Sequence, residues 1–259
     1  MTTEDLDLAT TLAREAGDIL LRHWADRSRL AVSAKRAGDF LSEADLASER
    51  HLRARLARAR PSDGWLGEES GAAGGGRRRW IVDPLDGTTN FLRGIPHWAV
   101  SVALEEAGRL VVGVVHDPVR GETFAARHGG GATLHGAPLA VAKTPALETA
   151  LFGTGIPFGD MPHIDDHAAD IARLMPHCAG VRRMGAAALD LAYVAAGRLD
   201  GFWERRLRMW DIAAGLVLLR EAGARVEGWR ADERPEDTGT VVAAPPALFP
   251  GFAAILREN

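Results

Sequence analysis

Two aspartates stand close together after an apolar run in residues 80–91, WIVDPLDGTTNF. Carboxylates bind hard cations, and the free N–H groups at the start of a helix bind phosphate. Because Pro84 disfavours the helical conformation for Asp83, we expect a tight turn that brings Asp83 and Asp86 together just before a short helix. The backbone carbonyl of Leu85, exposed in that turn, would add another oxygen. The stretch therefore indicates that cations and phosphate meet at one point, as in metal-assisted phosphoryl chemistry.

Other acids could join this site, although each also has a simpler structural interpretation. Glu68 and Glu69 follow a short extended piece, where two loop acids are commonly just solvated. Asp211 stands at a predicted helix start, where a negative charge stabilises the helix by about 0.3–1 kcal/mol. Asp45 stands in the first turn of another predicted helix and could cap it, and a capping role is open for Asp86 too. Taken singly, these acids do not distinguish a metal site from helix capping.

The N-terminal part of the chain is expected to contain two helices. Residues 4–24 carry apolar side chains at helical spacing. A second helix is expected from Ser42 to Ala59, because Ser42 and Asp45 have the spacing of a capping box. Its buried face is expected to consist of Leu46, Leu52 and Leu56. Both helices would pack against the remainder of this region.

Short apolar segments follow, separated by turn residues. Residues 98–126 are typical of a three-stranded meander. Residues 71–79 are expected to form a Gly/Ala/Arg loop, whose run of three arginines at residues 77–79 is expected to be a solvated face. Beyond residue 145, predicted strands alternate with predicted helices, which indicates an α/β arrangement. We therefore predict an N-terminal α+β lobe, residues 1–144, with most of the acids, and a C-terminal α/β lobe, residues 145–259, that supplies Asp211 and the substrate pocket.

Composition excludes several classes of protein. The chain has 259 residues, 46% of them apolar, and a formal charge of −4, which gives no electrostatic basis for direct nucleic-acid binding. The single cysteine, Cys178, excludes an internal disulfide, suits a reducing cytosol and is expected to be a small core residue. The N-terminus lacks the basic region of a signal peptide, and no apolar run is long enough for a membrane span. We expect a cytoplasmic protein without a membrane partner.

Three acidic motifs together resemble the inositol monophosphatase family, within the lithium-sensitive, Mg²⁺-dependent phosphatase superfamily. They are GEE at residues 67–69, WIVDPLDGTTNF at residues 80–91 and WDIAAG at residues 210–215. Residues 39–45 and 185–191 also match, so that the resemblance to bacterial-type members covers nearly the whole chain. It implies a five-layer αβαβα sandwich of the inositol monophosphatase and fructose-1,6-bisphosphatase type, usually assembled as a homodimer.

The resemblance also implies a role for each acidic motif. Two to three Mg²⁺ ions are implied, with Glu68, Asp83 and the Leu85 carbonyl on the first, Asp83, Asp86 and Asp211 on the second, and Glu68 on a weaker third. Thr88, supported by Asp45, would act with Glu68 to orient and deprotonate the attacking water. The N–H groups of Gly87 and Thr88 would hold the phosphate. The residues implied to contact the released alcohol are Ala187, Glu204 and Asp211.

The implied activity is hydrolysis of inositol 1-phosphate or a similar small polyol phosphate. Arg206 and Met209 stand where relatives often carry Gly and Pro, which leaves the alcohol pocket open to other substrates. The alternative on the same scaffold is histidinol-phosphate phosphatase. Fructose 1,6-bisphosphate, sulfate nucleotides and NADP phosphates are further candidate substrates, but the sequence shows no anchor for a second phosphate. The alternative of another class is a regulatory protein that binds transcription factors, against which the complete set of metal-binding carboxylates argues.

Overall fold

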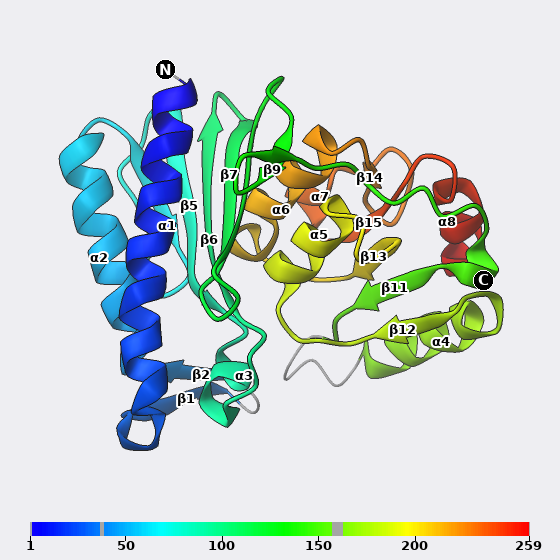
Figure 1. Cartoon of the computed structure of the whole chain (residues 1–259), viewed down its shortest axis with the longest axis horizontal. Helices are drawn as coiled ribbons and strands as arrows, with labels where there is room; N and C mark the ends of the chain where they lie inside the picture. Colours follow the sequence, from blue (N-terminus) through cyan, green and yellow to red (C-terminus); the bar gives the residue numbers. More distant parts are fainter. Residues whose placement is uncertain (1, 37–38, 157–162, 259) are drawn as a thin grey trace.

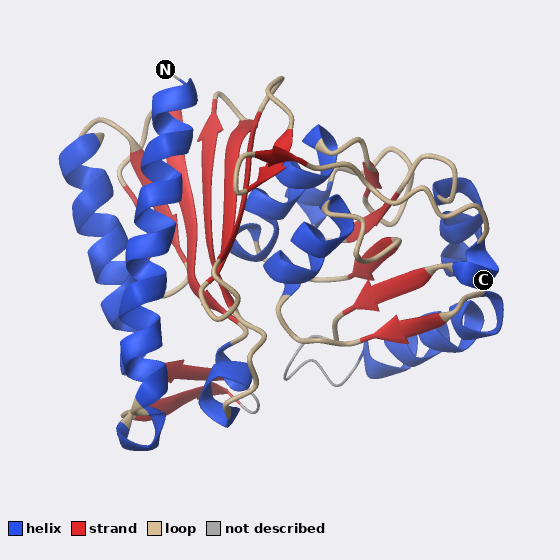
Figure 2. Cartoon of the chain, in the orientation of Figure 1, coloured by secondary structure: helices blue, strands red, loops and turns tan. Residues whose placement is uncertain are grey.

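The computed structural model describes residues 2–36, 39–156 and 163–258, which form five layers (Figure 1). The outer helices α1 and α2 cover one face of an eight-stranded sheet, and α5 and α6 lie between that sheet and a five-stranded one. The helices α4 and α8 cover the far face of the smaller sheet. The five-layer sandwich of helices and sheets, coloured by element type in Figure 2, is the expected fold class.

The first two layers come from the N-terminal half of the chain. The outer helices are α1 (Thr2–Ala25) and α2 (Glu43–Ala59), and a small hairpin of β1 (Val32–Arg36) and β2 (Asp39–Ser42) lies before α2. In spatial order, the large sheet consists of β10 (Ala137–Pro138), β9 (Ala132–Leu134), β8 (Glu122–Arg127), β7 (Arg109–Asp117), β6 (Ala99–Glu106), β5 (Arg78–Asp86), β3 (Gly64–Gly67) and β4 (Gly71–Ala73). Strands β6 to β8 confirm the predicted meander. Strands β3 and β5 pair in parallel, and this pairing places two of the acidic motifs side by side.

The remaining layers come from the second half of the chain. In spatial order, the smaller sheet consists of β12 (Gly180–Arg182), β11 (Leu151–Thr154), β13 (Gly201–Glu204), β15 (Val241–Ala244) and β14 (Arg225–Glu227). The helices are α4 (Ile164–Leu174), α5 (Ala187–Ala195), α6 (Met209–Glu221), α7 (Pro235–Thr238) and α8 (Phe249–Arg257). The predicted alternation of strands and helices is therefore present, with α5 and α6 packed between the two sheets.

The alternation of side chains along each strand separates the hydrophobic layers. In β13, Phe202 packs with the α5–α6 layer, whereas the next residue, Trp203, packs with Phe252 of α8. The same rule operates in the large sheet, where Ala103 faces the α5–α6 layer and Val102 faces α1 and α2. Successive side chains point to opposite faces of a strand, so both sheets are buried on both sides.

Three sequence-based expectations were wrong in detail. Leu46 is 38% exposed, because it precedes Leu52 by six positions and therefore lies about 120° around the helix from it. The loop at residues 71–79 contains β4 and the start of β5, and Arg78 pairs with Asp5 at 2.9 Å instead of being solvated. Cys178 is half-buried rather than part of the core.

None of the helices in the described ranges is both long and apolar enough to cross a membrane.

Candidate active site

Asp83 and Asp86 lie on the two sides of a β-bulge. Asp83 pairs with Ser101 of β6 and Asp86 pairs with Ala99, so three steps along β5 match two along β6. A bulge tolerates Pro84, which has no N–H to donate to the ladder. The predicted tight turn was therefore wrong, because the strand continues through Asp86 and it is the bulge that redirects the carboxylates.

Glu68 is placed beside Asp83 by the pairing of β3 with β5. Gly67 is opposite Val82 in this parallel pair, and the Glu68 N–H donates to the Val82 carbonyl at 3.2 Å. Glu68 and Asp83 are thus the residues that follow matched positions on neighbouring strands. The side chain of Glu68 is half-buried, and that of Asp83 is buried.

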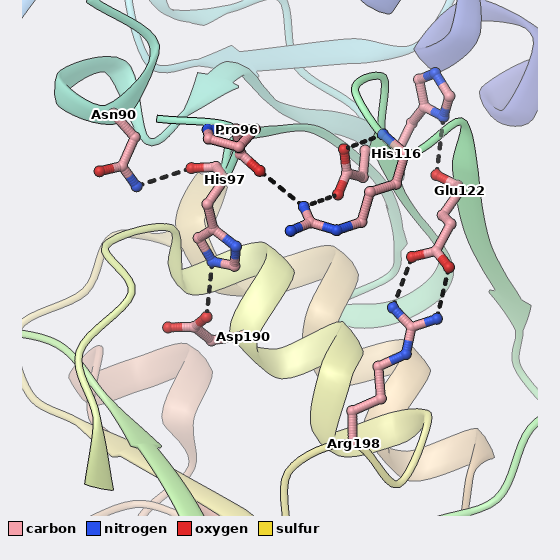
Figure 3. A network of polar contacts seen from close by, with 9 residues as sticks. Asn90, Pro96, His97, His116, Glu122, Asp190 and Arg198 are labelled. Atoms are coloured by element: carbon pink, nitrogen blue, oxygen red, sulfur yellow. Dashed lines mark hydrogen bonds and ion pairs between the residues drawn. The ribbon is translucent and has the colours of Figure 1, made fainter. Parts of the chain in front are cut away.

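The second half of the chain anchors Asp86. One Asp86 oxygen accepts a 2.8 Å hydrogen bond from the Ala188 N–H in the first turn of α5. Two residues further on, the Asp190 carboxylate lies 3.1 Å from Nε2 of His97 (Figure 3). The Asn90 side chain also donates to the His97 carbonyl at 2.8 Å, so the segment after α3 (Thr88–Arg93) is tied to α5. These contacts fix the first-half acids against the second half of the chain.

Asp211 and Glu204 approach from the second half of the chain. Asp211 is the third residue of α6, and its carboxylate accepts a 2.6 Å hydrogen bond from the Arg208 N–H. The capping role considered for Asp211 is therefore real, yet its charge also acts on Asp83 and Glu204. Glu204 ends β13 and is buried. Ala187 begins α5, next to the residue that binds Asp86.

Burial and like charges raise the pKa values of the clustered carboxyl groups. Burial is the largest cause for Asp83, followed by the charges of Glu68, Asp86 and Asp211, and its pKa lies well above the usual 3.8. Burial likewise raises the pKa of Asp86 to about 7, against the hydrogen bond from Ala188. Burial and then the charges of Asp86 and Glu68 raise the pKa of Asp211 well above 3.8. Glu68, Asp83, Asp86 and Asp211 therefore act on one another electrostatically.

The donor set fits hard divalent cations. Carboxylate and carbonyl oxygens are the ligands that Mg²⁺ prefers, and a cation would favour the ionised form of these acids against the burial and like charges that raise their pKa values. Among the residues that the structure describes, no three His, Cys, Asp or Glu side chains already stand as a group that could hold a metal ion. The fit therefore rests on the chemistry and charge of Glu68, Asp83, Asp86 and Asp211.

A hydroxyl group and a helix start lie beside the acids. Gly87, with φ of 89°, adopts the left-handed conformation at the N-terminal end of α3, where a Cβ would be strained. Thr88 Oγ1 lies 3.1 Å from Asp45 Oδ1 and 3.0 Å from the Leu85 carbonyl, and its single hydrogen can bond only one of them at a time. Burial raises the pKa of Asp45 to about 6, against its bonds from Ser42. The predicted capping box of Ser42 and Asp45 is confirmed.

The site contains residues that the sequence motifs did not single out. They are Ser48 and Glu49 of α2, His97 and Asp190. Each bonds to a segment 20 or more positions away along the chain, and no sequence motif joins the two partners. For Ser48 and Glu49 a weaker signal was present, because they follow Asp45 by three and four positions and so share its helix face.

Comparison with known proteins identifies the group to which this site belongs. The model described as "Inositol monophosphatase family" matches residues 1–259. The chain belongs to the inositol monophosphatase family.

Curated relatives in this family carry two kinds of name. An inositol-1-monophosphatase of Rhizobium meliloti is 48% identical over 234 residues, covering 88% of this chain and 86% of that protein. A Nus factor SuhB of Pseudomonas aeruginosa is 43% identical over 260 residues, covering 98% of this chain and 96% of that protein. The solved inositol monophosphatase of Anabaena (Nostoc) sp. PCC 7120 superimposes with a TM-score of 0.89 at 35% identity, covering 98% of this chain and 95% of that one. Membership of this family, whose members generally depend on Mg²⁺, supports a phosphatase.

Proposed function

We propose that this inositol monophosphatase family member hydrolyses inositol 1-phosphate, or a similar small polyol phosphate, in a Mg²⁺-dependent reaction. The observation that carries the proposal is the placement of Glu68 and Asp83 after matched positions of β3 and β5, with Asp86 across the bulge and a helix start beside them. Buried carboxyl groups so close together destabilise the folded protein. Binding of divalent cations and of a phosphate ester would explain why the chain carries them.

The proposed metal ligands follow the two strand ends and α6. Glu68, Asp83 and the Leu85 carbonyl would hold one ion, and Asp83, Asp86 and Asp211 a second, with Glu68 serving a weaker third. When bound, such ions neutralise phosphate charge and lower the pKa of water. The Leu85 carbonyl has two lone pairs, so one stays available to a cation even when the Thr88 hydroxyl donates to this carbonyl instead of to Asp45.

The other proposed roles concern water and phosphate. Thr88, held by Asp45, and Glu68 would orient the attacking water, and Glu68 would take its proton. The N–H groups of Gly87 and Thr88 would donate to the phosphate oxygens, since the first N–H groups of a helix have no partner within it. General-base assistance of this type contributes about 10²–10⁴-fold to the rate.

The released alcohol would lie against Ala187, Glu204 and Asp211. Glu204 is buried at the end of β13, and its pKa is raised well above 4.5 by burial and then by the charge of Asp211. A buried acid can bond hydroxyl groups of a polyol in either protonation state. Histidinol phosphate is the competing substrate on this scaffold, because a cationic amine would also suit this acidic pocket.

A second role in transcription is raised by the relatives named Nus factor SuhB, one of which is similar over 98% of this chain. We propose hydrolysis as the primary function, because the full set of carboxylates is present. We further propose two lobes, residues 1–144 and 145–259, in a homodimer in the cytoplasm.

Phosphate release from a panel of substrates tests the proposal. The panel consists of inositol 1-phosphate, histidinol phosphate, fructose 1,6-bisphosphate and 3′-phosphoadenosine 5′-phosphate, each with Mg²⁺ and with added Li⁺. We expect inositol 1-phosphate to give the highest kcat/KM and Li⁺ to inhibit. Full activity of Asp83→Asn would contradict the metal assignment. Negligible turnover of all four, with retention of transcription factors in a pull-down, would favour the regulatory role.

A further inference from the structure

The buried face of α2 changes from apolar to polar along the helix. Leu52 and Leu56 pack into the core between α1 and the large sheet. One and two turns earlier, the same face carries Glu49, Ser48 and Asp45, which are 4%, 0% and 0% exposed. Buried polar groups are costly unless they are hydrogen-bonded, so the polar half of this face must have partners.

These partners are the two segments that carry the proposed ligands. The Ser48 hydroxyl donates to the Pro84 carbonyl, inside the bulge, at 2.9 Å. The Glu49 carboxylate accepts a 2.9 Å hydrogen bond from the Glu69 N–H, directly after Glu68. Adjacent residues of one helix therefore bond to segments 36 and 20 positions away along the chain.

The segment at residues 67–70 fits closely against Glu49. A Cβ atom at Gly67 would stand 2.6 Å from one Glu49 oxygen, so a side chain there would displace the carboxylate from its present position. The Trp65 indole N–H also donates to the Ser70 hydroxyl at 2.9 Å. The backbone on both sides of Glu68 is therefore held in place.

We propose that Ser48 and Glu49 are positioning residues, which hold the Asp83 bulge and the Glu68 segment on one helix face so that both acids bind a divalent cation together. This inference rests on the proposed function. The two side chains would act through backbone groups and would touch neither cation nor substrate. Loss of such outer partners typically lowers metal affinity or activity by about 10–100-fold.

Calorimetric titration of Mg²⁺ and hydrogen exchange of the Glu69 amide test this role. The informative variants are Ser48→Ala and Glu49→Ala, which remove the bonds, and Glu49→Gln, which retains an oxygen acceptor. Leu56→Ala is the matched control, because Leu56 belongs to the apolar half of the same face and its side chain has no polar group to bond to either segment. We expect a Kd for Mg²⁺ about 10–100-fold higher in both alanine variants, near wild type in Glu49→Gln and unchanged in Leu56→Ala. Glu49→Ala should also accelerate exchange of the Glu69 amide in metal-free protein.

The outcomes separate this inference from the proposed function. Normal Mg²⁺ affinity in Ser48→Ala and Glu49→Ala would overturn the positioning role while leaving the proposed hydrolysis intact. An equal loss in Leu56→Ala would overturn it too, because general destabilisation would then explain the effect. A wild-type protein that neither binds Mg²⁺ nor releases phosphate would overturn the proposed function and this inference together. If Glu49→Ala does not fold, Ser48→Ala and Glu49→Gln decide the result.

Discussion

Replacing Asp86 by Asn should stabilise the metal-free protein while lowering its activity. Burial raises the pKa of Asp86 from 3.8 to about 7, with the charge of Asp190 adding to the effect. Since a difference of 1 in pKa corresponds to about 1.4 kcal/mol, an ionised Asp86 costs the folded state about 4 kcal/mol at neutral pH. Asn is uncharged and keeps an oxygen that can accept the bond from Ala188. Relaxation and water entry reduce such penalties, so we expect a gain of about 2–4 kcal/mol.

The gain should depend on pH in a defined direction. Below 3.8 the carboxyl group of Asp86 is protonated in both states and costs nothing. As the pH rises from 3.8 to about 7, the unfolded chain releases this proton first, so the folded wild type loses stability; above about 7 the loss is constant. The advantage of Asp86→Asn should grow through this window and then level off.

Urea unfolding in EDTA, at about pH 5 and about pH 8, measures this difference. Mg²⁺ at about 1,000 times its Kd should cancel the advantage of the variant, because a ligand at that concentration stabilises the protein that binds it by about 4.1 kcal/mol. An Asp86→Asn protein that is less stable than wild type in EDTA at the higher pH would refute the argument that charge at this site opposes folding.

Three further results are expected. EDTA should abolish phosphate release and Mg²⁺ should restore it in a standard phosphate assay; activity that survives dialysis against chelator would count against the ligand set. Asp45→Asn should lower kcat by about 10²-fold, as loss of positioned acid–base assistance does. Wild-type activity should fall below about pH 6, because the pKa of buried Asp45 is about 6. A pH–rate profile identical in both proteins would contradict this role. Arg198→Ala should lower the free energy of unfolding by about 1 kcal/mol, because it removes two 2.6 Å bonds to Glu122. It should leave kcat unchanged, and a change in kcat in the phosphate assay would link this pair to the site.

The acidic motifs could be predicted from the sequence because each is local. Asp83, Asp86 and Asp211 lie next to a strand end or a helix start, and those boundaries have their own sequence signals. The bulge was missed, since Pro84 between two acids suggests a turn as readily as an irregular strand. The pairing of β5 with β6 decides between them, and pairing depends on residues 99–101 rather than on the motif itself.

The contacts between the two halves of the chain could not be predicted from spacing. Asp86 and Ala188 are 102 positions apart, and His97 and Asp190 are 93 apart (Figure 3). A sequence shows a buried histidine and a buried acid only as two separate residues, and the packing of α5 against the large sheet brings them together. Long-range polar contacts of this kind become visible only when the layers are placed.

Helix α2 shows which part of such a network the sequence does contain. The spacing of leucines predicts a buried stripe that includes Leu46, but Leu46 is exposed, and the buried stripe runs through Asp45, Ser48, Glu49 and Leu52. Hydrophobic periodicity fails here because the start of the helix faces polar backbone of the site instead of the core. Once Asp45 is expected at the site, the residues three and four positions later must share its face. Polar residues at that spacing after a site residue are therefore candidates for positioning roles. Leu46 is exposed because it lies off the face that these polar residues share.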